Sequence, residues 1–298
     1  MIPLFEKSKE FIGHAGQIFS LAFDGNYIYS AASDKFVTRW DLTSETQDKF
    51  AIRFEKSPYS ICLIENQSKL VVGLENGDLH IFDLSLKKEI KFYQQHRSAI
   101  FYALENKLKN EFYTSDADGN IAVWDSLTLN LKVFLPFACG KIRRLRLNHD
   151  GSKLFLACQD GTIRIIETEF YNQIDEFFAH HDGATCVSVK ENQILTGGKD
   201  AHLKLWDLDS KKCLKSIPAH NFVIYDIEFL NENVFVSISR DKSIKIWDAN
   251  ELSVIQKIDA KSRGHKHSVN SIMKISDSSF ATCSDDRSIK LFRRIQSL

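Results

Sequence analysis

Short apolar runs, four in each of seven successive segments, set the pattern of the chain. In the first segment they are "QIFSLAF", "YIYSAAS", "FVTRWDL" and "KFAIRFE", at residues 17–23, 27–33, 36–42 and 49–55. Runs of this length and composition, separated by turn-like stretches, are typical of β-strands. Because the runs are almost continuously apolar, we expect each four-stranded sheet to pack face to face against its neighbours. Seven such sheets can close a ring.

A recurring Trp-Asp pair gives the period of the repeat. The stretch "SDKFVTRWDL" at 33–42 returns as "ADGNIAVWDS", "GKDAHLKLWDL" and "SRDKSIKIWDA". The aligned Trp positions are Trp40, Phe82, Trp124, Ile166, Trp206, Trp247 and Phe292, spaced by 42, 42, 42, 40, 41 and 45 residues. Six residues before them stand Asp34, Asn76, Asp118, Asp160, Asp200, Asp241 and Asp286. Glycine follows three of these acidic or amide residues, as suits a tight turn with a left-handed residue, although Lys, Ala or Arg follows the other four.

With four strands per unit and G-H…W-D marks from Gly13-His14 to Phe292, the chain resembles the WD-repeat β-propeller family. The resemblance implies an all-β fold: a single seven-bladed β-propeller of four-stranded antiparallel blades, in one domain over residues 1–298. The seventh unit stops at "SIKLFRRIQSL" after three strands. We therefore expect "PLFEKSKEFIG", near the N-terminus, to supply its missing outer strand and to close the ring.

Four units also carry a His 26 to 28 residues before the Trp and a hydroxyl residue ten before it. The sets are His14, Ser30, Asp34 and Trp40; His96, Thr114, Asp118 and Trp124; His180, Thr196, Asp200 and Trp206; and His220, Ser237, Asp241 and Trp247. A Ser-His-Asp set could serve a hydrolase. However, a triad is needed once and these sets recur at the repeat period, so we interpret them as structural hydrogen-bond networks, the role that the resemblance also implies.

The incomplete units support a structural role for these sets. Unit two has Phe54, Val72 and Phe82 at the three positions, and unit four has Ala138, Leu156 and Ile166. Joint replacement by apolar residues is expected for a buried network, because a stranded donor costs about 1–3 kcal/mol whereas removal of all partners can be nearly neutral. Unit seven keeps His265, Thr282 and Asp286 beside Phe292, which cannot donate, so we predict a weaker network there.

Composition narrows the function classes. The chain is 43% hydrophobic and 26% charged, with 39 basic and 39 acidic residues, so no global field favours nucleic acid or an anionic membrane. Charges in "MIPLFEKSKEFIG" argue against a signal peptide, and no segment approaches the roughly 18 apolar residues of a membrane span. We expect a soluble cytoplasmic protein, or a nuclear one in a eukaryote. Neither the six isolated cysteines nor the other histidines suggest a metal or cofactor site.

Function is expected where the repeats differ. The resemblance implies that partners most often bind the rim formed by the His loops and the Asp turns, to which three positions per unit point. These positions give an aromatic sector in units one to three and a basic sector in units four to six. The candidate rim residues are Phe19, Tyr59, Phe101, Lys141, Arg143, Lys199, Tyr225 and Arg240.

Exposed aromatic and Arg side chains are typical of interface hot spots. The leading hypothesis is a non-catalytic scaffold that binds a protein segment with hydrophobic anchors and an acidic or phosphorylated part paired by Arg143 and Arg240. Alternatively, the rings pack between blades and the basic residues form a solvated face. Arg144 and Arg146 are expected to pair with acidic residues of a neighbouring blade. A nucleic-acid-binding propeller that uses the basic sector is the second hypothesis, and an enzyme is disfavoured because the rim positions pair no nucleophile with a base.

Overall fold

In the computed structural model, which describes residues 4–295, the strands form seven four-stranded antiparallel sheets, or blades. The innermost strands of blades 1 to 7 are β2 (Ile18–Phe23), β6 (Pro58–Ile64), β10 (Ile100–Asn106), β14 (Ile142–Leu147), β18 (Ala184–Lys190), β22 (Ile224–Asn231) and β26 (Val269–Ser276). The second strands are β3 (Tyr27–Ala32), β7 (Lys69–Leu74), β11 (Glu111–Asp116), β15 (Lys153–Cys158), β19 (Gln193–Gly198), β23 (Val234–Ser239) and β27 (Ser279–Ser284).

The third strands, which carry the aligned Trp positions, are β4 (Phe36–Asp41), β8 (Leu79–Asp83), β12 (Asn120–Asp125), β16 (Thr162–Glu167), β20 (His202–Asp207), β24 (Ile244–Asp248) and β28 (Ser288–Arg294). The outer strands of blades 1 to 6 are β5 (Thr46–Arg53), β9 (Lys88–Tyr93), β13 (Leu131–Pro136), β17 (Gln173–Phe178), β21 (Cys213–Pro218) and β25 (Ser253–Ile258), and blade 7 takes β1 (Phe5–Ile12). A single 3₁₀ turn, η1 (Ala260–Ser262), completes the elements of the described chain.

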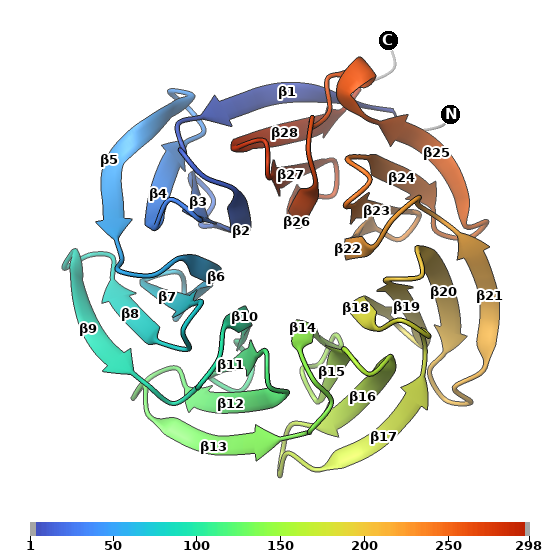
Figure 1. Ribbon diagram of the computed structural model, residues 1–298, viewed down its shortest axis with the longest axis horizontal. Coiled ribbons are helices and arrows are strands. Elements are labelled where there is room, and N and C mark those ends of the chain that lie inside the picture. Colours follow the sequence, from blue (N-terminus) through green and yellow to red (C-terminus); the bar gives the residue numbers. More distant parts are fainter. Residues whose placement is uncertain (1–3, 296–298) are drawn as a thin grey trace.

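The blades follow one another around a ring, with the innermost strands facing a central channel (Figure 1). The predicted all-β fold, seven blades and four antiparallel strands per blade are thus confirmed. Since consecutive strands of a blade are antiparallel, each innermost strand begins at one end of the channel, where the Asp turn of its blade also lies. The loops after the first and third strands lie at the opposite end.

The N-terminal strand closes the ring, as predicted. β1 pairs with β28 from Phe5↔Arg294 to Ile12↔Ser288, so the first and last strands of the described residues share blade 7 (Figure 1). The side chain of Gln256 in blade 6 also holds the backbone of Phe5, because its Oε1 accepts from Phe5 N and its Nε2 donates to Phe5 O, both at 2.8 Å. Ring closure therefore rests on backbone pairing and on this contact between blades.

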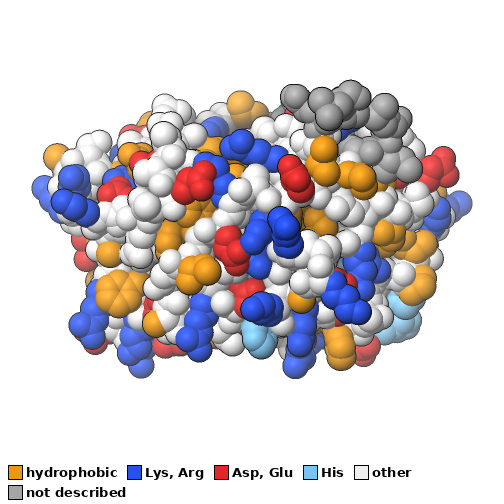
Figure 2. Space-filling view, turned by 90° about the horizontal axis from the view of Figure 1, so that it is seen from above, with side chains coloured by type: hydrophobic (Ala, Val, Ile, Leu, Met, Phe, Trp, Pro, Cys, Tyr) orange, Lys and Arg blue, Asp and Glu red, His pale blue; other side chains and the backbone are white. Residues whose placement is uncertain are grey.

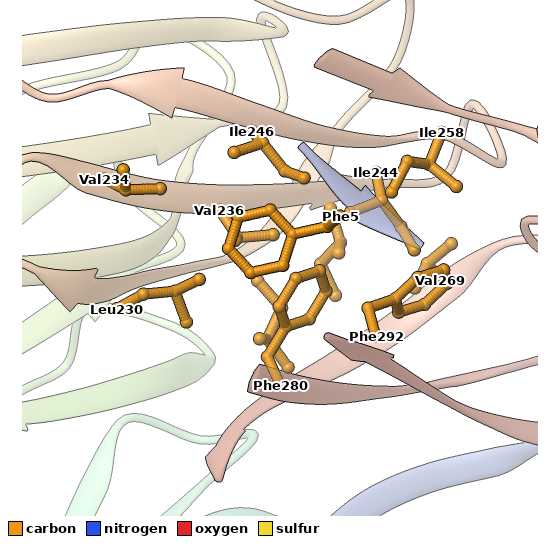
Figure 3. Packing of buried hydrophobic residues seen from close by; sticks show 12 residues of the cluster. Phe5, Leu230, Val234, Val236, Ile244, Ile246, Ile258, Val269, Phe280 and Phe292 are labelled. Atoms are coloured by element: carbon orange, nitrogen blue, oxygen red, sulfur yellow. The ribbon is translucent and has the colours of Figure 1, made fainter. Parts of the chain in front are cut away.

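Apolar clusters between adjacent blades make up the core. Between blades 6 and 7, Phe5 packs against residues such as Val236, Ile246 and Phe280 (Figure 3), and the rings of Phe5 and Phe280 are 5.5 Å apart. Equivalent clusters lie at the other blade junctions. Removal of the apolar surface of these clusters from water stabilises the ring by about 25 cal/mol per Å². Because each blade contributes to a cluster on both of its sides, its stability depends on both neighbours.

The residue after the Asp or Asn of each turn is left-handed in all seven blades. Its φ values are 72° at Lys35, 91° at Gly77, 86° at Gly119, 92° at Gly161, 62° at Ala201, 71° at Lys242 and 67° at Arg287. A left-handed conformation costs a non-glycine residue roughly 1–2 kcal/mol. Four blades bear this cost, so the turn requires the conformation but tolerates residues other than glycine.

The side of the disc carries mixed charge. Lys and Arg side chains are interspersed with Asp and Glu on the face seen in Figure 2, in keeping with the equal numbers of basic and acidic residues. Within residues 4–295, no helix has the length and apolar character needed to cross a membrane.

Candidate functional site

The hydrogen-bond networks lie inside the blades. In blade 1, the Trp40 Nε1–H donates to Ser30 Oγ at 2.7 Å, and Ser30 Oγ and Asp34 Oδ2 each lie 2.8 Å from a ring nitrogen of His14. Blades 5 and 6 repeat this geometry, with heavy-atom distances of 2.7–3.0 Å among His180, Thr196, Asp200 and Trp206 and among His220, Ser237, Asp241 and Trp247. These sets link the His loop and the Asp turn to the second and third strands.

The protonation of these histidines follows from their partners. Each aspartate accepts from Nδ1–H, and Nε2 accepts from the hydroxyl, which in turn accepts from the indole, so a neutral imidazole satisfies every group. Burial lowers the pKa of His14, His180, His220 and His265, although the neighbouring aspartates oppose this shift. A hydroxyl held in this way between an indole and an imidazole is a structural group in the blade interior.

In blade 3 the prediction that Asp118 belongs to the hydrogen-bond network is wrong. His96 Nδ1 lies 2.7 Å from Asp116 Oδ2 and not beside Asp118, which is exposed. Asp116 ends β11 and is fully buried, and its Oδ1 also accepts from the backbone N–H groups of Asp118 and Asn120. The Asp116 carboxylate thus bonds both the histidine and the backbone of the turn, and Asp118 lies exposed at the rim. Thr114 and Trp124 complete the set as in other blades.

Blade 7 lacks the indole donor. His265 Nδ1 and Nε2 lie 2.9 Å from Asp286 Oδ2 and from Thr282 Oγ1, and Phe292 fills the Trp position. The sequence analysis did not predict a second recurring contact, made by a lysine two residues before the Trp position. In blades 5, 6 and 7 this lysine donates to the backbone carbonyl of the residue before the histidine; the lysines are Lys204, Lys245 and Lys290. Their common offset was the signal that could have revealed it.

The candidate rim residues of blades 1 to 3 form a continuous group, named here the aromatic arc. The rings of Phe19 and Tyr59 are 4.8 Å apart and those of Tyr59 and Phe101 are 5.6 Å apart. All three side chains are half-buried and line a hollow at the rim end of the channel. The rings therefore pack against one another around the opening while keeping an accessible face.

This hollow, named here the mouth, has a volume of about 340 Å³. Its lining joins the aromatic arc to the basic sector: Lys141 Nζ lies 4.2 Å from the Phe101 ring centroid, and the Arg143 guanidinium carbon lies 4.3 Å from that of Tyr225. Gln17, Arg144, Asn270 and Asp285 complete the lining. The two sectors thus meet at one opening.

A second hollow of about 500 Å³, named here the basic groove, runs from the mouth over blades 4 to 6. It shares Lys141, Arg143 and Tyr225 with the mouth and adds the exposed residues Lys199, Arg240 and Phe222. Burial lowers the pKa of the Lys141 ammonium, and the charges of Arg143 and Lys199 lower it further. The groove therefore concentrates positive charge, and Phe222, which the sequence analysis missed, adds an exposed apolar surface at its edge.

Arg144 and Arg146 do not pair with a neighbouring blade, contrary to expectation. Arg144 Nε donates to Asp226 Oδ1 at 2.8 Å, and Arg146 pairs with Glu228, so both carboxylates come from blade 6, two blades away. The side chains are long enough to reach across the channel, past blade 5. Because Arg144 lines both the mouth and the hollow at the opposite end, this buried pair separates the two ends of the channel.

Among residues 4–295, no group of three or more His, Cys, Asp or Glu side chains is arranged to hold a metal ion. The lining of the mouth and the basic groove includes Asp285 and Asp200 beside the cations and the aromatic rings.

Comparison with known proteins supports the architecture. The family model for the WD domain, G-beta repeat, matches residues 5–41, 171–207, 211–248 and 256–293, which together make half of the chain. A WD repeat-containing protein 55 homolog from Dictyostelium discoideum is 24% identical over 229 residues, which cover 76% of this chain and 55% of the relative. Transducin beta-like protein 3 from Rattus norvegicus is 22% identical over 94% of this chain and 32% of its own length.

A third relative, the ribosome biogenesis protein WDR12 homolog from Nematostella vectensis, is 29% identical over 44% of this chain and 34% of its own length. The chain thus spans about half or less of the length of these three relatives. The matched repeats are blades 1, 5, 6 and 7, the blades in which the turn Asp pairs with the histidine. The chain belongs to the WD-repeat family of β-propeller proteins.

Proposed function

We propose that this propeller is a non-catalytic interaction scaffold that binds a segment of a partner protein across the mouth and the basic groove. The segment would place apolar side chains on the aromatic arc and acidic or phosphorylated groups beside Arg143 and Arg240. The observation that carries the proposal is the meeting of the arc and the cations at one opening. Aromatic and Arg side chains in a hollow supply most binding energy at protein interfaces.

The chemistry of the blade interiors supports a non-catalytic role. Each His-hydroxyl-Asp set is held within its own blade, and the hydroxyl already accepts from an indole in blades 1, 3, 5 and 6. A nucleophile would need access to substrate and a base free to take its proton. The buried hydroxyls and histidines provide neither.

The identity of the partner is proposed only as a class. One relative is named a ribosome biogenesis protein, and another is a kinesin-like protein, KIF21B, from Mus musculus. Ribosome assembly factors are a first group of partners to test, because they would also agree with a nuclear location.

The test is affinity capture from native lysate with quantitative mass spectrometry. The rim variant combines Tyr59→Ala, Phe101→Ala and Arg143→Ala. The matched control removes three exposed apolar side chains from loops at the opposite end of the channel, by Leu108→Ala, Leu127→Ala and Phe170→Ala. Thermal melting checks that both variants fold.

Partners that the control retains and the rim variant loses would support the proposal. Equal recovery of partners by the wild type, the rim variant and the control would refute the proposal and direct attention to the blade edges.

The four cations that line the basic groove favour one second candidate function, the binding of a single-stranded nucleic acid that stacks on the aromatic rings. Binding of that kind would weaken steeply as salt rises, because each neutralised phosphate releases counterions.

A further inference from the structure

The mouth is a blind well. Arg144 crosses from β14 to Asp226 on β22, and its guanidinium lies 4.5 Å from the Tyr102 ring centroid. The exposed fractions of the two side chains are 9% for Arg144 and 1% for Asp226. A partner chain that enters from the rim therefore meets a buried ion pair, and it must turn back or end inside about 340 Å³.

The two walls of the well differ in chemistry. One wall is the aromatic arc, whose half-buried rings line the mouth and can contact an apolar side chain. The other wall carries Arg143, which stacks on Tyr225 and has no hydrogen-bond acceptor or ion-pair partner within the described chain. A guanidinium carries five N–H donors, and a carboxylate fits this fork with two parallel hydrogen bonds.

The charge balance of the well favours a small anion. Lys141 adds a second cation beside Arg143, whereas the charge of Arg144 is already neutralised by Asp226. The opposing charge on the lining is Asp285, whose Oδ1 accepts from Asn270 Nδ2 at 2.8 Å. Burial also lowers the pKa of Arg143, so an anion that neutralises its charge would relieve this penalty.

We infer that the mouth binds the free C-terminal carboxylate of a partner chain whose last residue is aromatic or large and aliphatic. In such a residue one Cα carries both the carboxylate and the apolar side chain, so a single residue can satisfy both walls. An internal acidic residue would need an apolar neighbour and a reversal of the chain within the well. This inference rests on the proposed function, because it specifies what the rim binds.

Three small probes test the inference with the full chain: N-acetyl-glycyl-phenylalanine, its C-terminal amide, and N-acetyl-aspartyl-phenylalaninamide, whose carboxylate is internal. Binding is followed by NMR titration or calorimetry. Because the amide loses a charge-assisted hydrogen-bonded pair, we expect the free acid to bind about 10- to 100-fold more tightly than either other probe.

Variants assign the effect to the well. Arg143→Gln should abolish the preference for the free acid, and Asp285→Asn should tighten the acid several-fold without changing the amide. The matched control, Arg97→Gln, removes an exposed cation at the same end of the propeller that lines neither the mouth nor the basic groove, and it should leave all three affinities unchanged.

Equal binding of acid and amide, equal binding of the internal carboxylate, or no binding of any probe to the folded wild type would overturn the inference. Persistence of the acid preference in Arg143→Gln would overturn it as well. None of these results decides the proposed function, because the capture experiment tests rim binding whatever part of the partner enters the mouth. Equal probe affinities together with partner loss in the rim variant would refute only the C-terminal inference.

Discussion

Truncation of Asp226 is the sharpest test of the pair that separates the two ends of the channel. Its carboxylate accepts from Arg144 Nε at 2.8 Å and also from the backbone N–H groups of Ile227 at 2.9 Å and Ile272 at 3.2 Å. Asp226→Ala would strand a buried guanidinium and two backbone donors at once. The same carboxylate thus joins blades 4, 6 and 7.

The magnitude follows from burial. Loss of one partner from a buried ion pair costs about 3–5 kcal/mol. Since Arg144 lines a hollow at each end of the channel, water can solvate part of its charge, so we expect about 3–4 kcal/mol for Asp226→Ala. Arg144→Ala leaves Asp226 with its two backbone donors and should cost about 2–3 kcal/mol. The double variant leaves no uncompensated charge and should cost at least about 2 kcal/mol less than the sum of the two single costs.

Urea unfolding of the four proteins in this cycle measures the coupling between the two side chains. A matched cycle on Arg39 and Asp48, an ion pair whose side chains are 23% and 25% exposed, provides the control. We expect that pair to couple by about 0–1 kcal/mol because water screens it. The reasoning is refuted if the Arg144–Asp226 coupling is no larger than that of the control pair.

Three further predictions concern stability. Burial lowers the folded-state pKa of His14, His180, His220 and His265 below the ordinary histidine value of about 6.5, so below that pH the unfolded chain binds more protons than the folded chain. The free energy of unfolding should therefore be constant above about pH 7 and fall with acidification by at most about 1.4 kcal/mol per pH unit for each histidine. Urea midpoints that do not change from pH 8 to pH 5 would contradict this. Ala201→Gly should stabilise the protein by about 0.5–1 kcal/mol, since relief of the left-handed conformation exceeds the entropy cost of glycine, and a lowered melting temperature would contradict this. Thr196→Val strands Trp206 Nε1 and His180 Nε2 and should cost about 2–4 kcal/mol in urea unfolding, whereas a cost below 1 kcal/mol would show that water replaces the hydroxyl.

The sequence alone was sufficient to predict the ring, its seven blades and the strand that closes it. These features depend on periodicity and on strand count, which a repeat displays many times over. The rim could also be located, because a fixed offset within the repeat converts a position in the chain into a place on the propeller. Phe19, Tyr59 and Phe101 share one offset, and their rings line the same opening.

Contacts that break the repeat could not be predicted in the same way. In "TSDADGN" either aspartate could have reached His96, and only the burial of Asp116 at the end of β11 distinguishes it from Asp118. Arg144 and Asp226 lie 82 residues apart in sequence. Periodicity gives the height of each along the channel, but it does not show that a long side chain crosses to a blade two positions away.

The blades that depart most from the repeat also contribute to the candidate site. Blades 2 and 4 replace the hydrogen-bond network with apolar residues such as Val72 and Leu156, which are fully buried in the clusters between blades. The fold tolerates this because joint removal of buried polar partners leaves nothing unsatisfied. The family model does not match blades 2 to 4, yet these blades supply Tyr59, Phe101 and Arg143 to the mouth. Redundancy among the seven blades thus maintains the ring while the inner strands of the divergent blades are free to place other side chains at the mouth.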